Sequence, residues 1–140
     1  MVVGCLGQIN FRVSSEYVQT IERMQYSRSA RTAVHQRHNT SALTEFTGYD
    51  PAAITFDCYL DRSLGISDVM READRFEEYM KEGRAVSFVL GNKIYGEYRW
   101  LIQSSKAVPV HYDGRGVVIA AKVTVSIIEY TMEMQFLNLL

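Results

Sequence analysis

The sequence has few cysteines and prolines and no excess of one sign of charge, as in an ordinary globular domain. It contains two cysteines, two prolines and one tryptophan in 140 residues, and 15 Lys and Arg nearly balance 16 Asp and Glu. This balance excludes a whole-molecule field strong enough to imply nucleic acid or an anionic membrane as the partner. No apolar run approaches the ~20 residues of a spanning helix, so we expect a cytoplasmic product without a membrane partner. The length fits a single domain.

The sequence also lacks the motifs of an enzyme or of a metal site. Cys5 and Cys58 lack metal-type spacing, and two buried thiols are the expected state. His35 and His38 have the spacing His-x-x-His, but the arginines around them disfavour a cation and no third ligand lies near. His111 stands alone, and neither a phosphate-binding loop nor a nucleophile motif is present. We therefore expect no catalytic residue, no metal and no cofactor.

Hydrophobic periodicity predicts an α+β fold. Alternating apolar residues over 9–13 and 54–60 predict two half-buried strands, and the segment 17–24 is expected to close a hairpin with the first of them. A helix is expected over 68–82, because Ser67 can cap its start and Gly83 can end it in the left-handed region. One apolar stripe of this helix is expected to pack on the sheet: Val69, Ala73, Phe76 and Met80.

After the helix, the pattern returns to strands. The segment 85–90 is a short apolar run, and Gly91 and Asn92 suit the tight turn of a hairpin that returns at Ile94. The last strand alternates over 117–127 and would be about 40 Å long at ~3.4 Å per residue. Such a strand is longer than a small barrel needs, and it favours a sheet that continues from one subunit to the next.

One segment is unusually basic. No acidic residue occurs between Arg23 and Thr44, and the interpretation is a long polar loop over about 25–44. Long loops in compact domains are usually functional or disordered. A solvated loop, a contact with nucleic acid and a contact with an acidic protein face are the alternatives, and the last is favoured because only Tyr26 could stack on a base. The candidate contact residues are Arg23, Arg28, Arg31, His35, Arg37 and His38.

Six short strings, in a fixed order and spacing, point to a known family. They are GQINF (7–11), FTGYD (46–50), ITF (54–56), MKEGRA (80–85), IYGEY (94–98) and YDGRG (112–116). Together they resemble the GpU tail-protein family, which contractile-tailed phages and phage-derived bacteriocins encode. The chain departs from that family at Asp61, where members tend to carry Pro, and in its continuation past Tyr130.

The resemblance implies a tail-tube-like fold of two packed, mainly antiparallel β-sheets with the helix at about 68–82 and the basic loop. It divides the chain into a ring-forming domain over 1–130 and an apolar C-terminal extension over 131–140. The implied function is structural and not enzymatic: a ring of six copies that initiates or connects the tail tube at the baseplate hub. A terminator or connector ring at the head-proximal end and a nucleic-acid-binding module using the basic loop are the alternatives.

The resemblance also implies partners and a location. The partners are further copies of the chain, the tail tube protein, the baseplate hub, a LysM-type tail protein and the tape measure protein, without a specific nucleic acid. The protein is then made in the cytoplasm of a bacterial host and assembled into a virion or a tail-like particle.

Two further sets of residues follow from the strand pattern and from the composition of the C-terminus. If the last two long strands form the inner wall of the ring, their polar side chains face the lumen: Glu97, Arg99, Gln103, Lys122, Thr124 and Ser126. The core then holds Tyr98, Trp100, Ile102, Val123 and Val125. The apolar end of the chain either prolongs the final strand and packs internally or, as we favour, contacts a partner protein, through Met132, Met134, Phe136, Leu137, Leu139 and Leu140.

Overall fold

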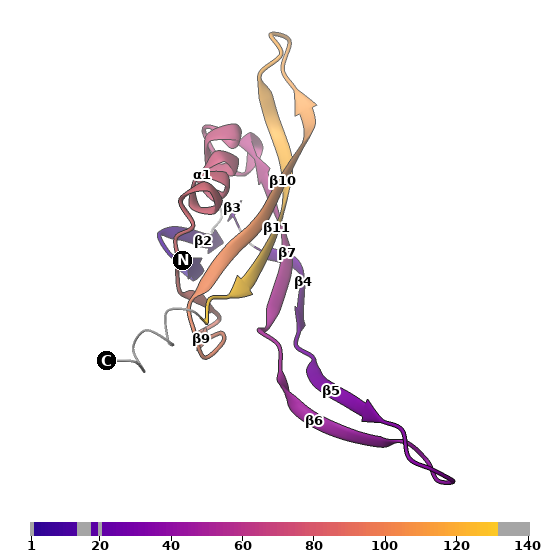
Figure 1. Cartoon of the computed structure of the whole chain (residues 1–140). Coiled ribbons are helices and arrows are strands. Elements are labelled where there is room, and N and C mark those ends of the chain that lie inside the picture. The colour runs from indigo at the N-terminus through magenta and orange to yellow at the C-terminus, as the bar shows by residue number, and fades with distance from the viewer. Residues whose placement is uncertain (1, 14–17, 20, 132–140) are drawn as a thin grey trace.

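The computed structural model describes residues 2–13, 18–19 and 21–131, and Figure 1 shows their arrangement. A five-stranded sheet has the order β3 (Val18–Gln19), β2 (Ile9–Val13), β1 (Val2–Leu6), β8 (Phe88–Leu90), β9 (Lys93–Ile94). A four-stranded sheet has the order β10 (Trp100–Tyr112), β11 (Val118–Glu129), β7 (Ala53–Asp61), β4 (Ile21–Ser27). A two-stranded sheet consists of β5 (Ala30–His35) and β6 (Leu43–Tyr49). The helix α1 spans Val69–Glu82 and follows the short 3-10 helix η1 (Arg62–Leu64). The α+β class and the mainly antiparallel sheets are confirmed.

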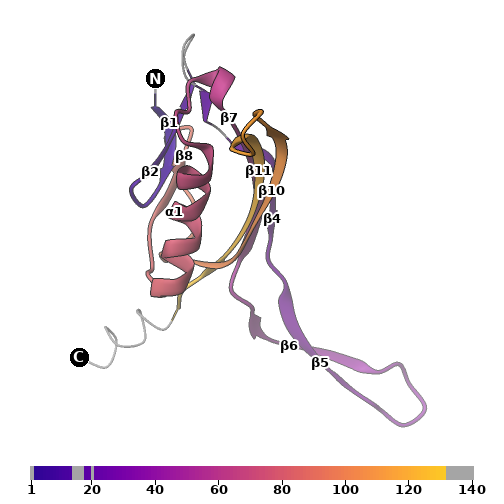
Figure 2. The same cartoon turned by 90° about the horizontal axis from the view of Figure 1, so that it is seen from above.

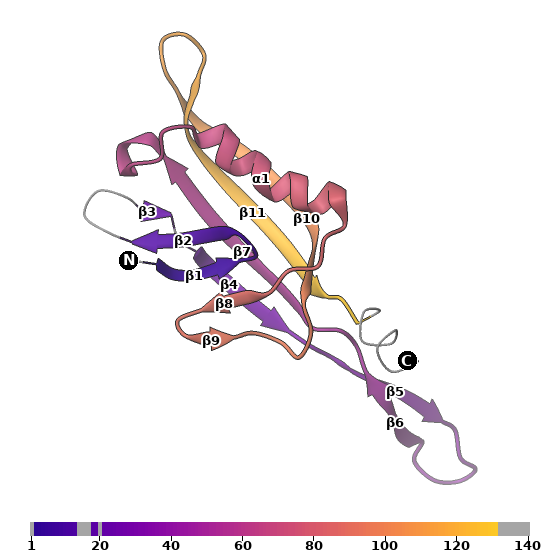
Figure 3. The same cartoon turned by 90° about the vertical axis from the view of Figure 1, so that its left-hand side faces the viewer.

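The body of the molecule has two layers. The four-stranded sheet is one layer, and α1 together with the five-stranded sheet forms the other, as Figures 1 and 3 show. Figure 3 places α1 over β10 and β11, and the five-stranded sheet over β7 and β4. The described elements therefore cover only one face of the four-stranded sheet.

The helix forms much as its sequence predicts. Asp68 caps the start, because its side chain accepts a hydrogen bond from the N–H of Arg71 at 3.2 Å, and Gly83 ends the helix with φ 63°. The predicted cap at Ser67 is thus one residue too early. The buried stripe contains Tyr79 in addition to the predicted Val69, Ala73 and Phe76, while Met80 is half-buried. The hydroxyl of Tyr79 accepts the N–H of Gln8 at 3.2 Å.

The long strands confirm their predicted registers. Residues of β7 alternate between buried and half-buried along its whole length, with Ile54, Phe56, Cys58 and Leu60 inside. In β11 the buried positions recur at every second residue from Ala121, and the predicted core residues Val123 and Val125 are among them. Trp100 and Ile102 are also buried, whereas Tyr98 is half-buried and precedes β10. Burial raises the pKa of the Cys58 thiol to about 12, and Cys5 is a free, half-buried thiol.

Two predictions for the N-terminal half are wrong in part. The segment 17–24 does not form one strand, since β3 pairs with β2 while β4 joins β7 in the other sheet. The expected loop over 25–44 is largely regular: it contains the end of β4, all of β5 and the start of β6. Both faces of β5 and β6 are solvent-exposed, so no alternation of apolar and polar residues marks these strands in the sequence. Within the described residues, no helix has the length and apolarity needed to cross a membrane.

Four aromatic rings hold the two layers together. The ring of Phe56, on β7, lies 6.0 Å from that of Phe11, 6.4 Å from that of Phe76 and 5.8 Å from that of Phe88. All four side chains are fully buried. Phe56 therefore joins the four-stranded sheet to both parts of the opposing layer.

We expect Phe56→Ala to lower the free energy of unfolding by about 3 to 5 kcal/mol, because it leaves a cavity between the layers. Phe46→Ala is the matched control: that side chain is 67% exposed, so the change should stay within about 0.5 kcal/mol. Urea unfolding followed by circular dichroism measures both. Equal losses in the two variants would contradict this assignment of the core.

Candidate assembly surfaces

A long hairpin projects from one end of the body. We call residues 29–50 the arm; it consists of β5, β6 and the connection 36–42, and Figures 1 and 2 show it extending on the side away from α1. The arm begins where β4 ends and finishes just before β7, so it prolongs two neighbouring strands of the four-stranded sheet. Among the described residues, its strands pair with each other and with no other strand.

The basic residues of the arm mostly have partners within it. Arg31 forms an ion pair with Asp50, Nε to Oδ1 at 3.4 Å, and His35 Nε2 lies 2.8 Å from an oxygen of Glu45. The Nε of Arg37 donates a hydrogen bond to the carbonyl oxygen of Ser41 at 2.9 Å. His38 lies in the exposed connection and Arg23 lies outside the arm, on β4. The stretch 23–44 contains no acidic residue, but in the fold its basic residues still have acidic neighbours. Glu45 of β6 and Asp50 at the end of the arm face them across the hairpin.

The two faces of the arm differ in chemistry. Cross-strand pairing places Arg31, Ala33, His35, Leu43 and Glu45 on one face, which we call the charged face. The other face carries Ala30, Thr32, Val34, Thr44, Phe46 and Tyr49, and we call it the uncharged face. Val34, Phe46 and Tyr49 are 59%, 67% and 49% exposed. The most exposed apolar surface of the arm therefore lies away from most of its charges.

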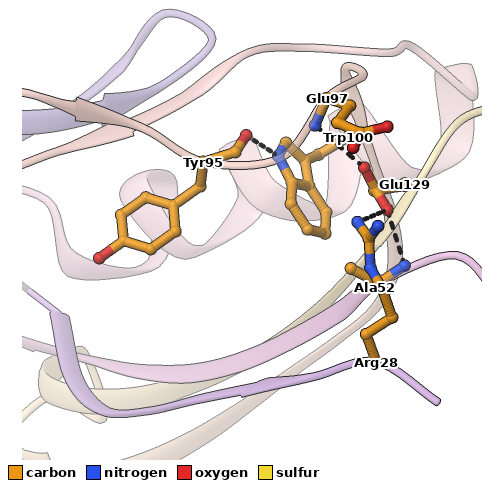
Figure 4. A network of polar contacts seen from close by, with 6 residues as sticks. All are labelled: Arg28, Ala52, Tyr95, Glu97, Trp100 and Glu129. Atoms are coloured by element: carbon orange, nitrogen blue, oxygen red, sulfur yellow. Dashed lines mark hydrogen bonds and ion pairs between the residues drawn. The ribbon is translucent and has the colours of Figure 1, made fainter.

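A buried carboxylate connects the root of the arm to the body, as Figure 4 shows. The side chain of Glu129, at the end of β11, is 1% exposed. Its Oε1 forms an ion pair with Arg28 and accepts the N–H of Ala52 at 2.8 Å, and its Oε2 accepts the N–H of Glu97 at 3.2 Å. Arg28 and Ala52 flank the arm on its two sides, and Glu97 leads into β10. One carboxylate thus joins the arm's root to β11 and to the entry of β10.

Arg28 is therefore a structural residue and not a free contact of a basic loop. Burial is the largest single influence and acts to lower its pKa, but Glu129, Tyr26 and Glu97 together outweigh this effect and raise the pKa. The guanidinium also lies over the ring of Tyr49, 5.2 Å from its centroid, which ties β6 to the same junction.

The approach to β10 needs a glycine. Trp100 is fully buried and its Nε1 donates a hydrogen bond to the carbonyl of Tyr95 at 2.8 Å, as Figure 4 shows. Gly96 has φ 80°, and a Cβ there would lie 2.7 Å from the indole ring. Only glycine allows the chain to pass this ring and to present the N–H of Glu97 to the buried carboxylate.

The open face of the four-stranded sheet is polar and internally paired. Asp57 accepts a hydrogen bond from Thr124 at 2.8 Å and lies 3.3 Å from the Nζ of Lys122. These two partners, the hydroxyl first, hold the pKa of Asp57 below its usual range. Thr55 and Ser126 form a similar hydroxyl pair at 3.3 Å. We call this surface the polar face.

The predicted lumen set is thus only partly one surface. Lys122, Thr124 and Ser126 lie together on the polar face, but Gln103 sits at a shift of register between β10 and β11 and pairs with no residue of β11. Lys106 and Ser104 take its place beside Thr124 and Ser126. The shift moves the residues of β10 from Ser104 to Pro109 by one position, which the sequence pattern does not show. Glu97 and Arg99 precede β10 and lie outside this row of paired residues.

A second projection lies at the opposite end of the sheet from the arm (Figures 1 and 3). The β10–β11 hairpin extends past the body, and Asp113 closes its turn by accepting the N–H groups of Arg115 and Val117 at 2.7 and 3.0 Å. These bonds, the one from Arg115 first, lower the pKa of Asp113. Exposed apolar side chains gather here as on the arm: Val108, Val110, Tyr112 and Val117.

The structure also locates the other residues considered as sites, apart from those outside its described part. In the described part of the chain, no group of three or more His, Cys, Asp or Glu residues could hold a metal ion. His111 is exposed near the tip of the β10–β11 hairpin. Asp61 caps η1 by accepting the N–H of Ser63 at 2.8 Å. Residues 132–140, with all the predicted docking residues, lie outside the described residues.

Comparison with known proteins identifies the family. The family model Phage P2 GpU matches residues 7–131, so the chain belongs to the GpU family. GpU proteins are structural phage tail proteins and not enzymes, and the chain is accordingly a tail component of the phage particle. A solved structure of the tail of an empty GTA particle with C6 symmetry contains a similar chain, at 12% identity and a TM-score of 0.46. The match covers 79% of this chain and 77% of that chain. No curated protein matches this sequence.

We expect Glu129→Gln to lower the free energy of unfolding by about 2 to 3 kcal/mol, because it leaves the charge of Arg28 without its partner. The value is at the low end for a buried pair since the Arg28 side chain is 23% exposed. Glu45→Gln breaks the exposed pair with His35 and should change stability by less than about 0.5 kcal/mol. Urea unfolding of both variants checks this, and the double variant Arg28→Met/Glu129→Gln should regain part of the loss. A Glu129→Gln variant as stable as the parent would contradict the role of this junction.

Proposed function

We propose that the chain forms a closed ring in which β4 of each copy pairs with β10 of the next. The observation that carries this proposal is the strand order β10-β11-β7-β4, in which every neighbouring pair is antiparallel. The two edge strands of this sheet consequently run in opposite directions. If β4 of one copy is placed beside β10 of the next, the result is one continuous antiparallel sheet.

Such pairing favours a ring for a physical reason. An unpaired edge strand exposes N–H and C=O groups that can join other chains, and pairing between copies removes both edges at once. The contact joins two different surfaces, so it repeats head to tail and closes when the rotation per copy divides a full turn. We infer six copies from the GpU family resemblance, which implies sixfold symmetry.

The polar face is the proposed wall of the channel. Closing the sheet leaves α1 and the five-stranded sheet on one side of the ring and the polar face on the other. A water-filled channel suits hydroxyl groups and paired charges such as those of Asp57 and Lys122. The helix layer would then form the outer surface of the ring.

The two projections are the proposed contacts along the tail axis. Edge strands make contacts within the ring, whereas the arm and the tip of the β10–β11 hairpin leave from opposite ends of the strands. Eight of the ten exposed large apolar residues in the described chain lie on these projections. We assign one end to the baseplate hub and the other to the tail tube, which makes the protein the initiating ring. The LysM-type and tape measure proteins are further partners by family analogy.

The two alternative functions differ in how well the structure supports them. A head-proximal terminator or connector ring would use the same edge pairing and differs only in the proteins at its two ends. A nucleic-acid-binding function gains little support, because Arg28, Arg31, His35 and Arg37 already have partners within the chain. The apolar extension over 131–140 is proposed to act in assembly, since its composition is strongly apolar.

Single cysteines on adjacent residues of β11 test the channel wall. A thiol in Thr124→Cys should react with maleimide in the free subunit, whereas a thiol in Val125→Cys should not, because Val125 is fully buried. In assembled particles, Thr124→Cys should react with a small maleimide and be protected from one coupled to a protein too large for the channel. Equal reaction of Thr124→Cys with both reagents in the particle would contradict the assignment of the polar face to the channel.

A further inference from the structure

A groove lies open at one side of the body, between the edges of its two layers. One wall is β4, the edge strand of the four-stranded sheet, and the other is the segment that leads from β9, the edge strand of the five-stranded sheet, toward β10. The hollow has a volume of about 620 Å³. Its lining includes Met24, Tyr26 and Arg28 on the first wall and Lys93, Tyr95 and Glu97 on the second. We call it the edge groove, and Figure 4 shows Arg28, Tyr95 and Glu97 on its two walls.

The edge groove is partly apolar. Two exposed large apolar residues of the described chain lie outside the arm and the β10–β11 hairpin: Tyr26 on β4, which is 48% exposed, and Ile94 on β9, which is 72% exposed. Met24 and Tyr95 are partly buried and pack against the core. The groove therefore continues the core outward to two strand edges. Exposed apolar surface that is rimmed by polar residues is typical of a contact between proteins.

Two charged side chains border the edge groove. Lys93 is exposed, and its Nζ lies 4.8 Å from the centroid of the Tyr95 ring. Glu97 is exposed as well, although its N–H donates a hydrogen bond to Glu129. Arg28 already has Glu129 as its partner. A surface that fits the groove should therefore offer an acidic group to Lys93 and a basic group to Glu97.

The helix α1 carries such a surface on the other side of the body. One flank of α1 faces the five-stranded sheet, because Arg75 donates a hydrogen bond to the carbonyl of Gln8 at 3.1 Å. At 3.6 residues per turn, Glu77 and Lys81 lie on the opposite flank, which we call the outer flank. They form an ion pair at 3.3 Å, and both side chains are substantially exposed. Since α1 lies over β10 and β11, the outer flank faces past the β10 edge (Figure 3).

The last turns of α1 and the edge groove lie at the same end of the four-stranded sheet. Soon after α1 ends, Val86 forms a bridge with Trp100, the first residue of β10. Trp100 pairs with Glu129, whose carboxylate also accepts the N–H of Glu97 in the groove wall. Pairing β10 of one copy with β4 of another therefore brings the last turns of α1 toward the groove.

We propose that the edge groove of one copy receives the outer flank of α1 of the next copy. The inference rests on the proposed pairing of β4 with β10, which places the covered layer of the next copy beside the groove. In Figure 3, α1 and the chain from β9 toward β10 run in the same direction along the sheet. Glu77 of the next copy then lies at Lys93. Lys81 of the next copy lies at Glu97, so each charge meets one of opposite sign.

This contact limits how the ring closes. Backbone pairing of β4 with β10 sets the spacing of the copies, but neighbouring strands tolerate a range of twist. A second contact lies in the outer layer, where the apolar stem of Lys81 and the adaptable side chain of Met80 cover Tyr26. Two separate contacts fix the rotation from one copy to the next. The edge groove therefore helps to determine the number of copies in the ring.

Crosslinking in assembled particles tests the proposal. In the double variant Lys93→Cys/Glu77→Cys, a short bismaleimide should join neighbouring copies into a ladder of dimers and larger species on a denaturing gel. The two thiols of one copy lie on opposite sides of the body, so the crosslinks form between copies. Lys93→Cys/Glu82→Cys is the matched control, because Glu82 lies at the same end of α1 but on the other flank. It should give no more product than the single variant Lys93→Cys.

Charge reversal gives an independent measure. Lys93→Glu and Glu77→Lys should each lower the yield of complete particles by about tenfold or more, because each places like charges together at every contact of the ring. The combined variant Lys93→Glu/Glu77→Lys should restore most of the yield. Glu82→Lys makes the same charge change on the other flank of α1 and should leave the yield unchanged.

The failure of this contact can be distinguished from the failure of the ring. If copies do not crosslink in particles whose reconstruction shows β4 paired with β10, the contact is wrong and the ring stands. If the combined charge variant also fails to restore the yield, the edge groove receives a different tail protein, which overturns the proposal as well. Particles in which β4 and β10 do not pair would overturn the proposed ring and, with it, this contact.

Discussion

The interaction on which this structure depends is the buried carboxylate of Glu129. Burying a charge is costly, and here the cost is offset by the Arg28 ion pair and by the N–H groups of Ala52 and Glu97. Glu129 and its three partners come from four separate parts of the chain. Glu129 ends β11, Arg28 follows β4, and Ala52 and Glu97 precede β7 and β10. This junction therefore ties the root of the arm to the body.

The faces, edges and ends of the four-stranded sheet around this junction differ in what they contact. Its covered face forms the core with α1 and the five-stranded sheet, and its polar face holds paired hydroxyl and charged groups. Its two edges run antiparallel to each other, and its two ends carry the arm and the β10–β11 hairpin. In the proposed ring, edges join copies, ends join neighbouring proteins and the polar face borders the channel. This proposed function needs no enzyme-like pocket, because the protein acts by connecting other tail proteins.

The sequence predicts those elements that bury one side. In β7, β11 and α1, each buried face repeats with the period of its element, so their bounds and the buried side chains of the long strands follow directly. The strands of the arm could not be predicted in this way, because both of their faces are exposed and no apolar period marks them. Its basic residues look free in the sequence, since Glu45 and Asp50 lie just beyond the acid-free stretch and reach it only across the hairpin. Gln103 was misplaced for another local reason, a shift of register that periodicity cannot show.

The burial of Glu129 can be predicted from the sequence, but its partners cannot. It stands at the next alternate position after Ile127 in a row of buried residues, and a charged residue in such a row signals a buried partner. The identity of the partners could not be read, because they lie 32, 77 and 101 positions away. Long-range polar contacts of this kind depend on the tertiary fold, whereas the apolar pattern is local. The family model, which matches residues 7–131, adds the class of protein and leaves the contacts to the structure.

A cryo-electron microscopy reconstruction of the assembled particle tests the central claim most directly. We predict one closed ring of six copies at the hub end of the tail, with β4 of each copy hydrogen-bonded to β10 of the next and Thr124 facing the channel. A single copy or three copies at that level, or a ring whose β4 and β10 edges do not pair, would contradict it.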